Sequence, residues 1–531
     1  MRACPSETAR LTALALLATA GCHRDKTPDQ PGEQPVVYAL SAPGELVAVP
    51  NLDDDDQDGV GDWEQVGAPG EDDLQDLTLE SGPGTLTLTL TGLARVWQDG
   101  AAVLDDVTTS ATLTTTGSVT LGVEMPDFVS EASLAVSWAG TGEAEGQSGQ
   151  ASVALRGAPL IFNHHLQQAE MVYAMSGSGN EDFIAGFEAA LGEHFEKYAL
   201  KDYGRDVWIQ DEFELGTATS EGHRLDVILN SVRTQNGNYL DPLAEEQWAG
   251  PNVYIHTWGD GRATAQDYGG NIEITPPLVA NGVSYPFGRL YYGAWDNGGP
   301  KEEVRDRFEA QGVQDPFTLD VQWLCVGHVD EFMSFIPDAT APRGFRLLFA
   351  DTRVGRSFLE GLDRTTELPR FETGHGYATV GDMLDDEGLW AYNDEVQATY
   401  LDSYLDTLRA EFALTDDEII ALPAAFEQNE LCGGYGLALI PGTANLTVAQ
   451  TEEDGPVKLF IPDPFLRSDV DDQGSDPLIA AVNALLPAEV EPIWLDDWQD
   501  YHLAWGEVHC GSNSRRTPMD DAWTLSVGEE E

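Results

Sequence analysis

The alternation of hydrophobic and polar positions predicts an all-β segment at residues 36–157. Thr85–Thr91 alternates threonine with leucine, so one strand face is apolar and the other polar. The same pattern recurs at Ala111–Met125, Ala132–Trp138 and Gln150–Arg156, separated by glycine-rich turns and without helical periodicity. Several short alternating strands with regular turns are typical of a small β-sandwich of immunoglobulin-like type.

Residues 158–531 combine strand and helix patterns. Short apolar runs at Val172–Met175, Phe345–Ala350 and Pro492–Leu495 predict strands. A helix capped by Asn180 is expected to carry one apolar face, formed by Phe183, Phe187, Leu191, Phe195 and Tyr198. Further helices are expected at Glu395–Phe412, at the Thr-Asp-Asp-Glu capping box that starts with Thr415, and over Leu478–Leu486 after Asp476-Pro477. This mixture predicts one large α/β catalytic domain.

The first 35 residues have the pattern of an export signal followed by a tether. Basic residues precede the apolar run Leu11–Ala20, and Gly21-Cys22 follows it. Residues 1–22 resemble a bacterial lipoprotein signal in which Cys22 is lipidated, and an ordinary cleaved signal is the alternative. The run is too short for a permanent membrane span. Both interpretations export the protein, to the cell envelope or the medium, and residues 23–35 form a polar tether.

The chain is strongly acidic. It has 92 acidic and 27 basic residues, which give a formal net charge of −65. Nucleic acid is not expected as a partner, because phosphate binding requires clustered lysine and arginine. The negative field suits a cationic substrate or divalent cations, and solubility alone is an equally adequate explanation of the bulk charge.

Cysteine use does not indicate a disulfide framework. Of the five cysteines, Cys4 and Cys22 belong to the signal, which leaves Cys325, Cys432 and Cys510. One bridge between Cys325 and Cys432 is an open alternative that no sequence feature supports, and Cys325 is interpreted as a strand thiol near the site.

Three polar clusters carry the candidate chemistry. Cys510 lies in GEVHCGSN, Asp211 in WIQDEFE, and His328 and Asp330 in VGHVDEF. Two carboxylates match a guanidinium, whose planar fork offers donors to two acceptors at once. A thiolate would attack the guanidinium carbon, while His328 would give a proton to departing ammonia and later activate water.

The carboxylates also affect the Cys510 thiol. They raise its pKa, because they disfavour a second anion nearby. An incoming guanidinium cation reverses this effect, and a protonated His328 adds to the reversal. The reactive thiolate is therefore predicted to form mainly once substrate is bound.

Seven strings resemble, in the same order, those of the protein-arginine deiminase family. They are VWIQDEFELG (207–216), GGNIEITPP (269–277), NGVSYPFGRL (281–290), WLCVGHVDEFMSFIP (323–337), RGFRLLFA (343–350), DDEIIALPAAF (416–426) and YHLAWGEVHCGSNSRR (501–516). The resemblance covers most of residues 158–531 and implies a five-bladed, pseudo-symmetric α/β propeller, the pentein fold, with the site at its centre. Together with the sandwich, it predicts a multidomain α+β protein.

The resemblance implies conversion of arginine side chains in proteins to citrulline, with release of ammonia. By position, Cys510 is the nucleophile, His328 is the acid and base, and Asp211 and Asp330 grip the guanidinium. Trp208 is expected to pack against the aliphatic stem of the substrate, and Arg233 to contact its backbone.

The resemblance also implies calcium. One set of ligands consists of Gln210, Glu214 and Glu273, with backbone carbonyls at Gly269 and Ile272. A second set consists of Glu212, Asn230 and Ser231. These are the oxygen donors that calcium prefers. The chain departs from the family at Asn230, which replaces an aspartate, and at Gln235, which replaces an arginine.

A separate acidic loop, NLDDDDQDGVGD, occupies residues 51–62. Its alternate carboxylates and Gly59 resemble a calcium-binding turn, with Asp53, Asp55, Asp58 and Asp62 as candidate ligands. The alternative is a solvated acidic linker.

Three functions remain open from the sequence. The first is a calcium-dependent enzyme that acts on arginine-containing proteins and contacts a membrane only through a lipid anchor. The second is a hydrolase of free arginine or another small guanidine, suggested by Gln235. The third is a non-catalytic calcium-binding surface protein, suggested by the acidic loop and the sandwich. The sequence does not assign a role to Arg515 and Arg516.

Overall fold

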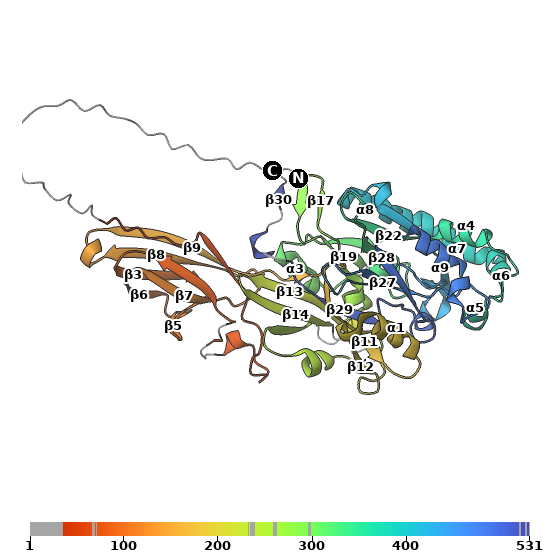
Figure 1. Ribbon diagram of the computed structural model, residues 1–531, viewed down its shortest axis with the longest axis horizontal. Helices are drawn as coiled ribbons and strands as arrows, with labels where there is room; N and C mark the ends of the chain where they lie inside the picture. The colour runs from red at the N-terminus through yellow and green to blue at the C-terminus, as the bar shows by residue number, and fades with distance from the viewer. Residues whose placement is uncertain are drawn as a thin grey trace, which may run out of the picture.

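The computed structural model describes most of the chain from residue 36 onward. The described residues are 36–65, 69–70, 72–231, 233, 239–258, 263–295, 299–519, 522–525 and 528–529. The predicted signal and tether, with Cys22, lie outside them, as does Gln235. Within these ranges no helix is long and apolar enough to cross a membrane. Figure 1 shows an elongated molecule with an all-β lobe at one end and a mixed α/β lobe at the other.

The all-β lobe is a sandwich of two sheets. Its strands are β1 (Glu45–Ala48), β2 (Gln75–Glu80), β3 (Gly84–Gly92), β4 (Arg95–Gln98), β5 (Ala101–Leu104), β6 (Ser110–Thr115), β7 (Ser118–Glu124), β8 (Glu131–Gly140) and β9 (Ser148–Gly157). The strand order is β1-β9-β8-β3-β6 in one sheet and β2-β7-β4-β5 in the other. The leucines of β3 are buried and its threonines point outward, as the alternation predicted. Apolar side chains of both sheets form one core between them.

The mixed lobe repeats one strand arrangement in five sheets of the described chain. The sheets comprise β10 (Ile161–Phe162), β13 (Phe213–Ser220), β14 (His223–Ser231) and β15 (Val253–Trp258); β29 (Ser512–Arg516), β11 (Ala169–Ser176) and β12 (Phe195–Ala199); β16 (Ile272–Ile274), β19 (Leu290–Ala294) and β20 (Phe317–Asp320); β21 (Met333–Pro337), β22 (Phe345–Asp351) and β23 (Ile419–Pro423); and β26 (Thr447–Ala449), β27 (Val457–Pro462) and β28 (Val490–Leu495). In each sheet one strand pairs antiparallel with one neighbour and parallel with the next.

Helical segments connect the parallel pairs. A parallel pair needs a crossover connection, for which a helix is the usual solution. The helices are α1 (Glu181–Leu191), α2 (Ile209–Glu212), α3 (Glu302–Gln311), α4 (Thr352–Glu360), α5 (Pro369–Gly374), α6 (Val380–Asp385), α7 (Glu387–Val396), α8 (Asp402–Phe412) and α9 (Pro477–Leu485). Smaller sheets are formed by β17 (Leu278–Ala280), β18 (Val283–Tyr285) and β30 (Gly528–Glu529), and by β24 (Phe426–Asn429) and β25 (Tyr435–Ala438). Figure 1 shows α4 to α8 gathered at the end of the lobe away from the sandwich.

The helix predictions are only partly correct. Helix α9 begins at Pro477 as expected, and the Asp476 side chain accepts hydrogen bonds from two backbone N–H groups of its first turn. The capping box at Thr415 is confirmed, on a short 3₁₀ turn. The helix after Asn180 was predicted too long, because Gly192 takes a positive φ of 56° and ends it. Phe195 and Tyr198 therefore belong to the strand β12.

The interpretation of Cys325 as a free strand thiol is wrong. Cys325 and Cys432 form a disulfide whose Cα atoms are 5.9 Å apart and whose partners are 107 positions apart. Such spacing carries no signature in the sequence, because the bridge depends on the approach of Leu324 to Gly436, which form an isolated bridge between extended segments. Cys510 is the free cysteine of the described chain.

Candidate active site

The four predicted catalytic residues come from three segments that meet in the mixed lobe. Asp211 lies on α2, His328 and Asp330 lie at the turn before β21, and Cys510 lies two residues before β29. The Cys510 Sγ atom is 3.5 Å from Asp330 Oδ2. The His328 Nδ1 atom is 3.6 Å from Asp211 Oδ1. Residues up to 299 positions apart therefore share one site, as predicted.

Hydrogen bonds hold the Cys510 segment against α2. The backbone N–H of Gln210 donates to the carbonyl of Cys510 at 3.3 Å. The Asn513 side chain donates to the carbonyl of Phe213 at 2.7 Å. Strand β29 also pairs with β11 along its length. Nucleophile and carboxylate are thus positioned by buried regular structure, which limits their freedom relative to each other.

Asp211 and Asp330 are buried acceptors with too few donors. Their exposed fractions are 7% and 2%. The Oδ1 atom of each has no hydrogen-bond partner among the described residues. Burial, opposed by the charges of His328 and Arg233, raises the pKa of Asp211. Because buried carboxylate oxygens without donors are costly, the site suits a cation that brings several N–H donors at once.

The orientation of the His328 ring is fixed by a backbone carbonyl. His328 is completely buried, and its Nε2 donates to the carbonyl oxygen of Ala265 at 2.8 Å. A carbonyl can only accept, so the neutral ring carries its proton on Nε2. The Nδ1 atom, which faces Asp211, is therefore free to accept and release a proton.

The Cys510 thiol lies in an anionic environment. Burial, followed by the charges of Asp330 and Asp211, raises its pKa well above the ordinary value. The Asn445 side chain donates to Sγ at 3.4 Å, and its Oδ1 accepts the backbone N–H of His509 at 2.9 Å. Asn445 orients the nucleophile, but sequence reasoning missed it, because it is 65 positions away in an unremarkable segment.

Gly270 is a second residue that was not singled out. A methyl group at this position would lie 2.6 Å from Asp211 Oδ1 and 2.9 Å from His328 Nδ1. Both distances are shorter than van der Waals contact allows. The absence of a side chain at Gly270 is therefore what lets the carboxylate and the imidazole approach each other.

Trp208 forms an apolar wall beside the thiol. It is partly buried and contacts Tyr501 edge to face, with ring centroids 5.8 Å apart. A methyl group at Gly506 would lie 2.4 Å from the Trp208 ring and 3.3 Å from Cys510 Cβ. Gly506 thus keeps the space between the indole and the nucleophile open, as the predicted role of Trp208 requires.

Comparisons with known proteins identify the family of the chain. The sequence profile of "Protein-arginine deiminase (PAD)" matches residues 147–524. The chain belongs to the protein-arginine deiminase family. It is 32% identical over 400 residues to protein-arginine deiminase type-4 of Rattus norvegicus, and 33% identical over 401 residues to protein-arginine deiminase type-3 of Homo sapiens. Each match covers 70% of this chain and 56% of the relative, so the chain spans little more than half the length of these deiminases.

The first predicted calcium set is brought together behind the catalytic carboxylates of this family member. Gln210 Nε2 donates to Glu214 Oε2 at 3.0 Å and to the Gly269 carbonyl at 3.5 Å. Glu214, Ile272 and Glu273 line the same small cavity. Burial and the charge of Glu273 raise the pKa of Glu214 well above its ordinary value. Two buried carboxylates that repel each other, joined by amide and carbonyl oxygens, fit a hard cation.

The second predicted calcium set already contains a protein cation. Glu212, Asn230 and Ser231 are buried, and Ser231 Oγ donates to the carbonyls of Asp211 and Glu212. Arg233 Nε lies 2.7 Å from Glu212 Oε2. Glu212 Oε1 and Asn230 Oδ1 lack partners among the described residues, but the guanidinium neutralises the one carboxylate of this set. The second set therefore fits a calcium ion less well than the first.

Arg233, predicted to contact the substrate backbone, pairs with buried carboxylates beside the site. Its side chain is 6% exposed and lies 2.6 Å from Asp206 in addition to Glu212. Its charge is 3.9 Å from Asp211 Oδ2. Three carboxylates therefore hold the guanidinium next to Asp211, and its contact with a substrate backbone stays a prediction.

The acidic loop in the sandwich lobe gathers its carboxylates into close groups. Asp53 and Asp62 lie with Asp73 close enough to share one ion, and Asp55 groups in the same way with Asp72 and Asp73. Asp58 turns away, toward Asp54 and Asp56. The loop borders a cavity of about 200 Å³. Sequence reasoning missed Asp72 and Asp73, because they follow the loop in the chain and join it only in space.

Burial gives these carboxylates unusual acidities. It is the main reason why the pKa of Asp53 is raised to about 6 and that of Asp73 to about 7. Neighbouring carboxylates add to the shift of both. A divalent cation would stabilise buried carboxylates that repel one another, because its charge offsets theirs.

Proposed function

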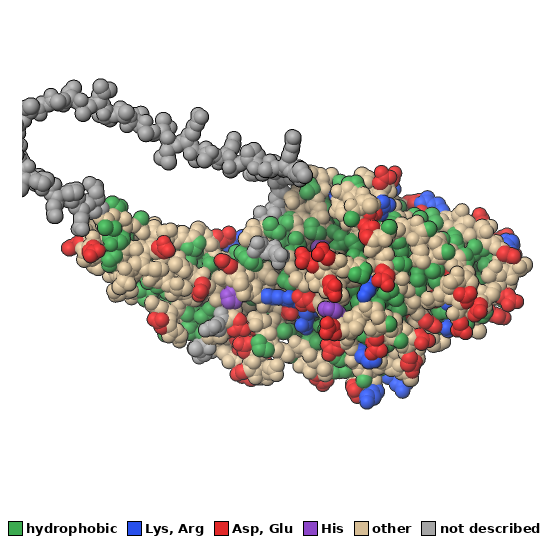
Figure 2. Space-filling model, in the orientation of Figure 1, with side chains coloured by type: hydrophobic (Ala, Val, Ile, Leu, Met, Phe, Trp, Pro, Cys, Tyr) green, Lys and Arg blue, Asp and Glu red, His purple; other side chains and the backbone are tan. Residues whose placement is uncertain are grey.

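We propose that this chain hydrolyses the guanidinium group of protein arginine residues to citrulline and ammonia. The observation that carries the proposal is the pair of buried, partnerless Oδ1 atoms of Asp211 and Asp330 beside the only free thiol of the described chain. Family membership supports the same reaction. The acidic side chains spread over the face shown in Figure 2 support a cationic substrate, because a negative field attracts it.

The first half of the reaction forms a covalent intermediate. The Cys510 sulfur adds to the guanidinium carbon, and the bond from that carbon to one terminal nitrogen breaks. The proton of the thiol passes by way of His328 Nδ1 to this nitrogen, which departs as ammonia. The product is a thiouronium that keeps the positive charge between Asp211 and Asp330.

The second half releases citrulline. Water adds to the thiouronium carbon, the carbon–sulfur bond breaks, and a urea remains on the side chain. One proton of the water returns to the Cys510 sulfur, and the other leaves through His328 to solution. Because the carboxylates raise the pKa of the free thiol, the thiolate forms mainly when the guanidinium offsets their charge.

Calcium belongs to the proposal. Gln210, Glu214 and Glu273 would hold one ion, with the carbonyls at Gly269 and Ile272. When bound, calcium would supply positive charge near Asp211 and so order α2, which carries it. The pairing of Arg233 with Glu212 supports one ion at the active site rather than two.

We also propose the organisation of the whole chain. The repeated strand arrangement of the five sheets supports a five-bladed propeller over residues 158–531, and residues 36–157 are an immunoglobulin-like sandwich. Residues 1–22 are a lipoprotein signal ending at Cys22, and residues 23–35 are a tether. The enzyme then acts outside the cytoplasm, on proteins and not on nucleic acid, and contacts the membrane only through its lipid.

The test is citrulline and ammonia production from an arginine-containing peptide and from free arginine. With calcium the peptide is expected to turn over, and a chelator is expected to reduce kcat/KM at least about 100-fold, because Glu214 and Glu273 then repel each other behind Asp211. Turnover of free arginine alone would replace the proposal with hydrolysis of small guanidines. Full activity in the presence of chelator would show that the reaction does not require calcium. If neither substrate were turned over, the alternative of a non-catalytic calcium-binding surface protein would replace the proposal.

A pH series tests the acidic loop. Without calcium, the melting temperature is expected to fall as the pH rises from about 4 to about 7. The reason is that folded Asp53 and Asp73 hold protons in this range, whereas unfolded aspartates have lost them. Calcium near neutral pH is expected to restore stability, by about 2.7 kcal/mol at a concentration one hundred times its Kd. Asp73→Asn should reduce this calcium response, and the exposed Asp76→Asn should retain it. An equal response in both variants would show that calcium binds elsewhere.

A further inference from the structure

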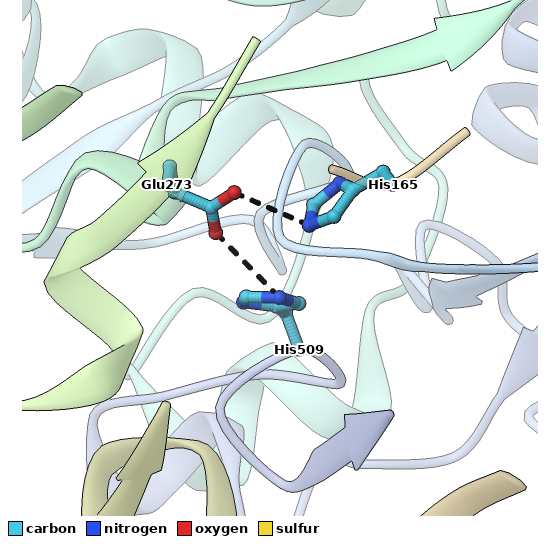
Figure 3. A group of neighbouring side chains, drawn as sticks. All are labelled: His165, Glu273 and His509. Carbon is cyan, nitrogen blue, oxygen red and sulfur yellow. Dashed lines mark ion pairs between the residues drawn. The ribbon is translucent and has the colours of Figure 1, made fainter. Parts of the chain in front are cut away.

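Two imidazoles point at the same buried carboxylate behind the active site. His165 precedes β11, Glu273 lies on β16, and His509 directly precedes Cys510. Figure 3 shows both rings directed at the carboxylate of Glu273. His165 Nε2 is 3.2 Å from Glu273 Oε2, and His509 Nε2 is 3.6 Å from Glu273 Oε1. The side chains of His165, Glu273 and His509 are 12%, 4% and 9% exposed, respectively.

The Nδ1 atom of each ring has a polar partner of its own. His509 Nδ1 lies 2.9 Å from Asp330 Oδ2, and His165 Nδ1 lies 3.1 Å from Ser334 Oγ. A histidine that binds a metal ion through one nitrogen commonly has its other nitrogen hydrogen-bonded to a carboxylate or another polar group. Both rings have this arrangement, and in both Nε2 is the nitrogen directed at Glu273.

The Glu273 carboxylate has an oxygen that can still accept a ligand. Glu273 is buried, and its Oε1 has no hydrogen-bond partner among the described residues. It borders a cavity of about 30 Å³, whose other polar walls include Glu214 and Arg516. Such a volume holds about one water-sized particle. Arg516 adds positive charge, but its guanidinium donates to three backbone carbonyls, and Glu214 supplies a second carboxylate that offsets it.

The spacing matches a four-coordinate ion. Bonds of about 2.0–2.2 Å from zinc to nitrogen and oxygen, at tetrahedral angles, place ligand atoms about 3.3–3.6 Å apart. Each Nε2 atom has about this separation from one of the two Glu273 oxygens, 3.2 Å for His165 to Oε2 and 3.6 Å for His509 to Oε1. One ligand atom from each of the three residues can be chosen so that all lie within 4.8 Å of one another.

We propose that His165, Glu273 and His509 bind a divalent transition-metal ion of the zinc type. Two imidazoles and a carboxylate suit zinc, cobalt or nickel, whereas calcium takes six to eight oxygen ligands. Neither histidine belongs to the calcium sets that the family resemblance implies. The ion would share Glu273 with the first calcium set, so the two metals compete.

Metal binding would also affect Asp330, the carboxylate next to the Cys510 thiol. His509 joins the ion on one side to Asp330 on the other, and Asp330 is the residue 3.5 Å from Cys510 Sγ. An ion on Nε2 makes the opposite ring N–H a stronger donor to Asp330. The carboxylate is then held toward His509 and is less available to a guanidinium. Zinc is therefore expected to inhibit, a consequence that rests on the proposed function.

The binding test does not depend on catalysis. Zinc binding to the full chain is measured by calorimetry, and cobalt binding by the visible absorption that nitrogen ligands give this ion. His165→Gln is expected to weaken both by at least about 100-fold, since changes around a metal ligand already cost about 10–100-fold. Ser334→Ala, which frees His165 Nδ1, is expected to weaken them by about tenfold. His223→Gln, on β14 and remote from the cluster, should bind as the parent does.

Two further arms sharpen the test. The cobalt spectrum is expected to persist in Cys510→Ser, which shows that the thiol is not a ligand. Excess calcium is expected to displace the cobalt. Equal affinity and an unchanged cobalt spectrum in the parent, His165→Gln and Ser334→Ala would overturn the site, whether or not the protein produces citrulline.

Discussion

Replacing Cys510 with serine is expected to lower the rate of citrulline formation by at least about 10⁴-fold. Cys510 is the only free cysteine of the described chain, and its sulfur lies 3.5 Å from Asp330 Oδ2, one of the two carboxylates that would grip the guanidinium. A serine hydroxyl in the same anionic surroundings would not ionise, even with a guanidinium bound. His328 Nδ1 faces Asp211, so the ring is placed to serve ammonia and water and not to make a serine nucleophilic.

The measurement is kcat/KM for an arginine-containing peptide, together with the peptide's Kd. Cys510→Ser is expected to bind the peptide within about tenfold of the parent, because Asp211, Asp330 and Trp208 remain. The parent, but not the variant, should form an acid-stable covalent adduct with an arginine-like amidine that carries a leaving group. A variant that retains a tenth of the parental rate would contradict the role of Cys510 as nucleophile.

The sequence predicted the site well because its chemistry is carried by residue types. A thiol, an imidazole and two carboxylates are few in kind, and the strings that carry them occur in family order. The structure brings Cys510, His328, Asp211 and Asp330 together as expected. Residues that act only by position were missed: Asn445 holds the thiol through one amide, and Gly270 matters because it has no side chain. No composition or spacing rule marks either residue.

Local patterns predicted the strands better than the ends of the helices. The threonine–leucine alternation of β3 fixed its buried face, because the period of a strand is two. The helix after Asn180 was extended over Phe195 and Tyr198, since both positions continue the apolar period. The positive φ of Gly192 ended it, and the aromatic rings pack from a strand instead.

Charge produced the largest differences between expectation and structure. Arg233 was assigned to substrate alone, and its pairing with the buried carboxylates of Asp206 and Glu212 was not foreseen. The acidic loop was read along the chain, but Asp72 and Asp73 complete it from a following segment. In both cases the partner that satisfies a buried charge is distant in sequence, which a linear pattern does not reveal.

Replacing Gly270 with alanine is expected to lower kcat/KM at least about 100-fold. The added methyl group would lie 2.6 Å from Asp211 Oδ1 and 2.9 Å from His328 Nδ1, so one of the two must move. Gly270 has no positive φ, and the backbone itself therefore accepts alanine. Displacement of a catalytic group by about 1 Å costs on the order of 100-fold, whereas overpacking one methyl group costs about 1–3 kcal/mol of stability.

Gly250→Ala is the matched control, because an added methyl group there meets no atom within 4 Å. Both variants are compared by kcat/KM and by thermal unfolding. Gly270→Ala should remain folded with a large loss of activity, and Gly250→Ala should keep both properties. A rate for Gly270→Ala within threefold of the parent would show that the approach of Asp211 to His328 is not needed for the reaction. The imidazole would then act on the leaving nitrogen without help from this carboxylate, and Asp330 alone would have to position the guanidinium for attack.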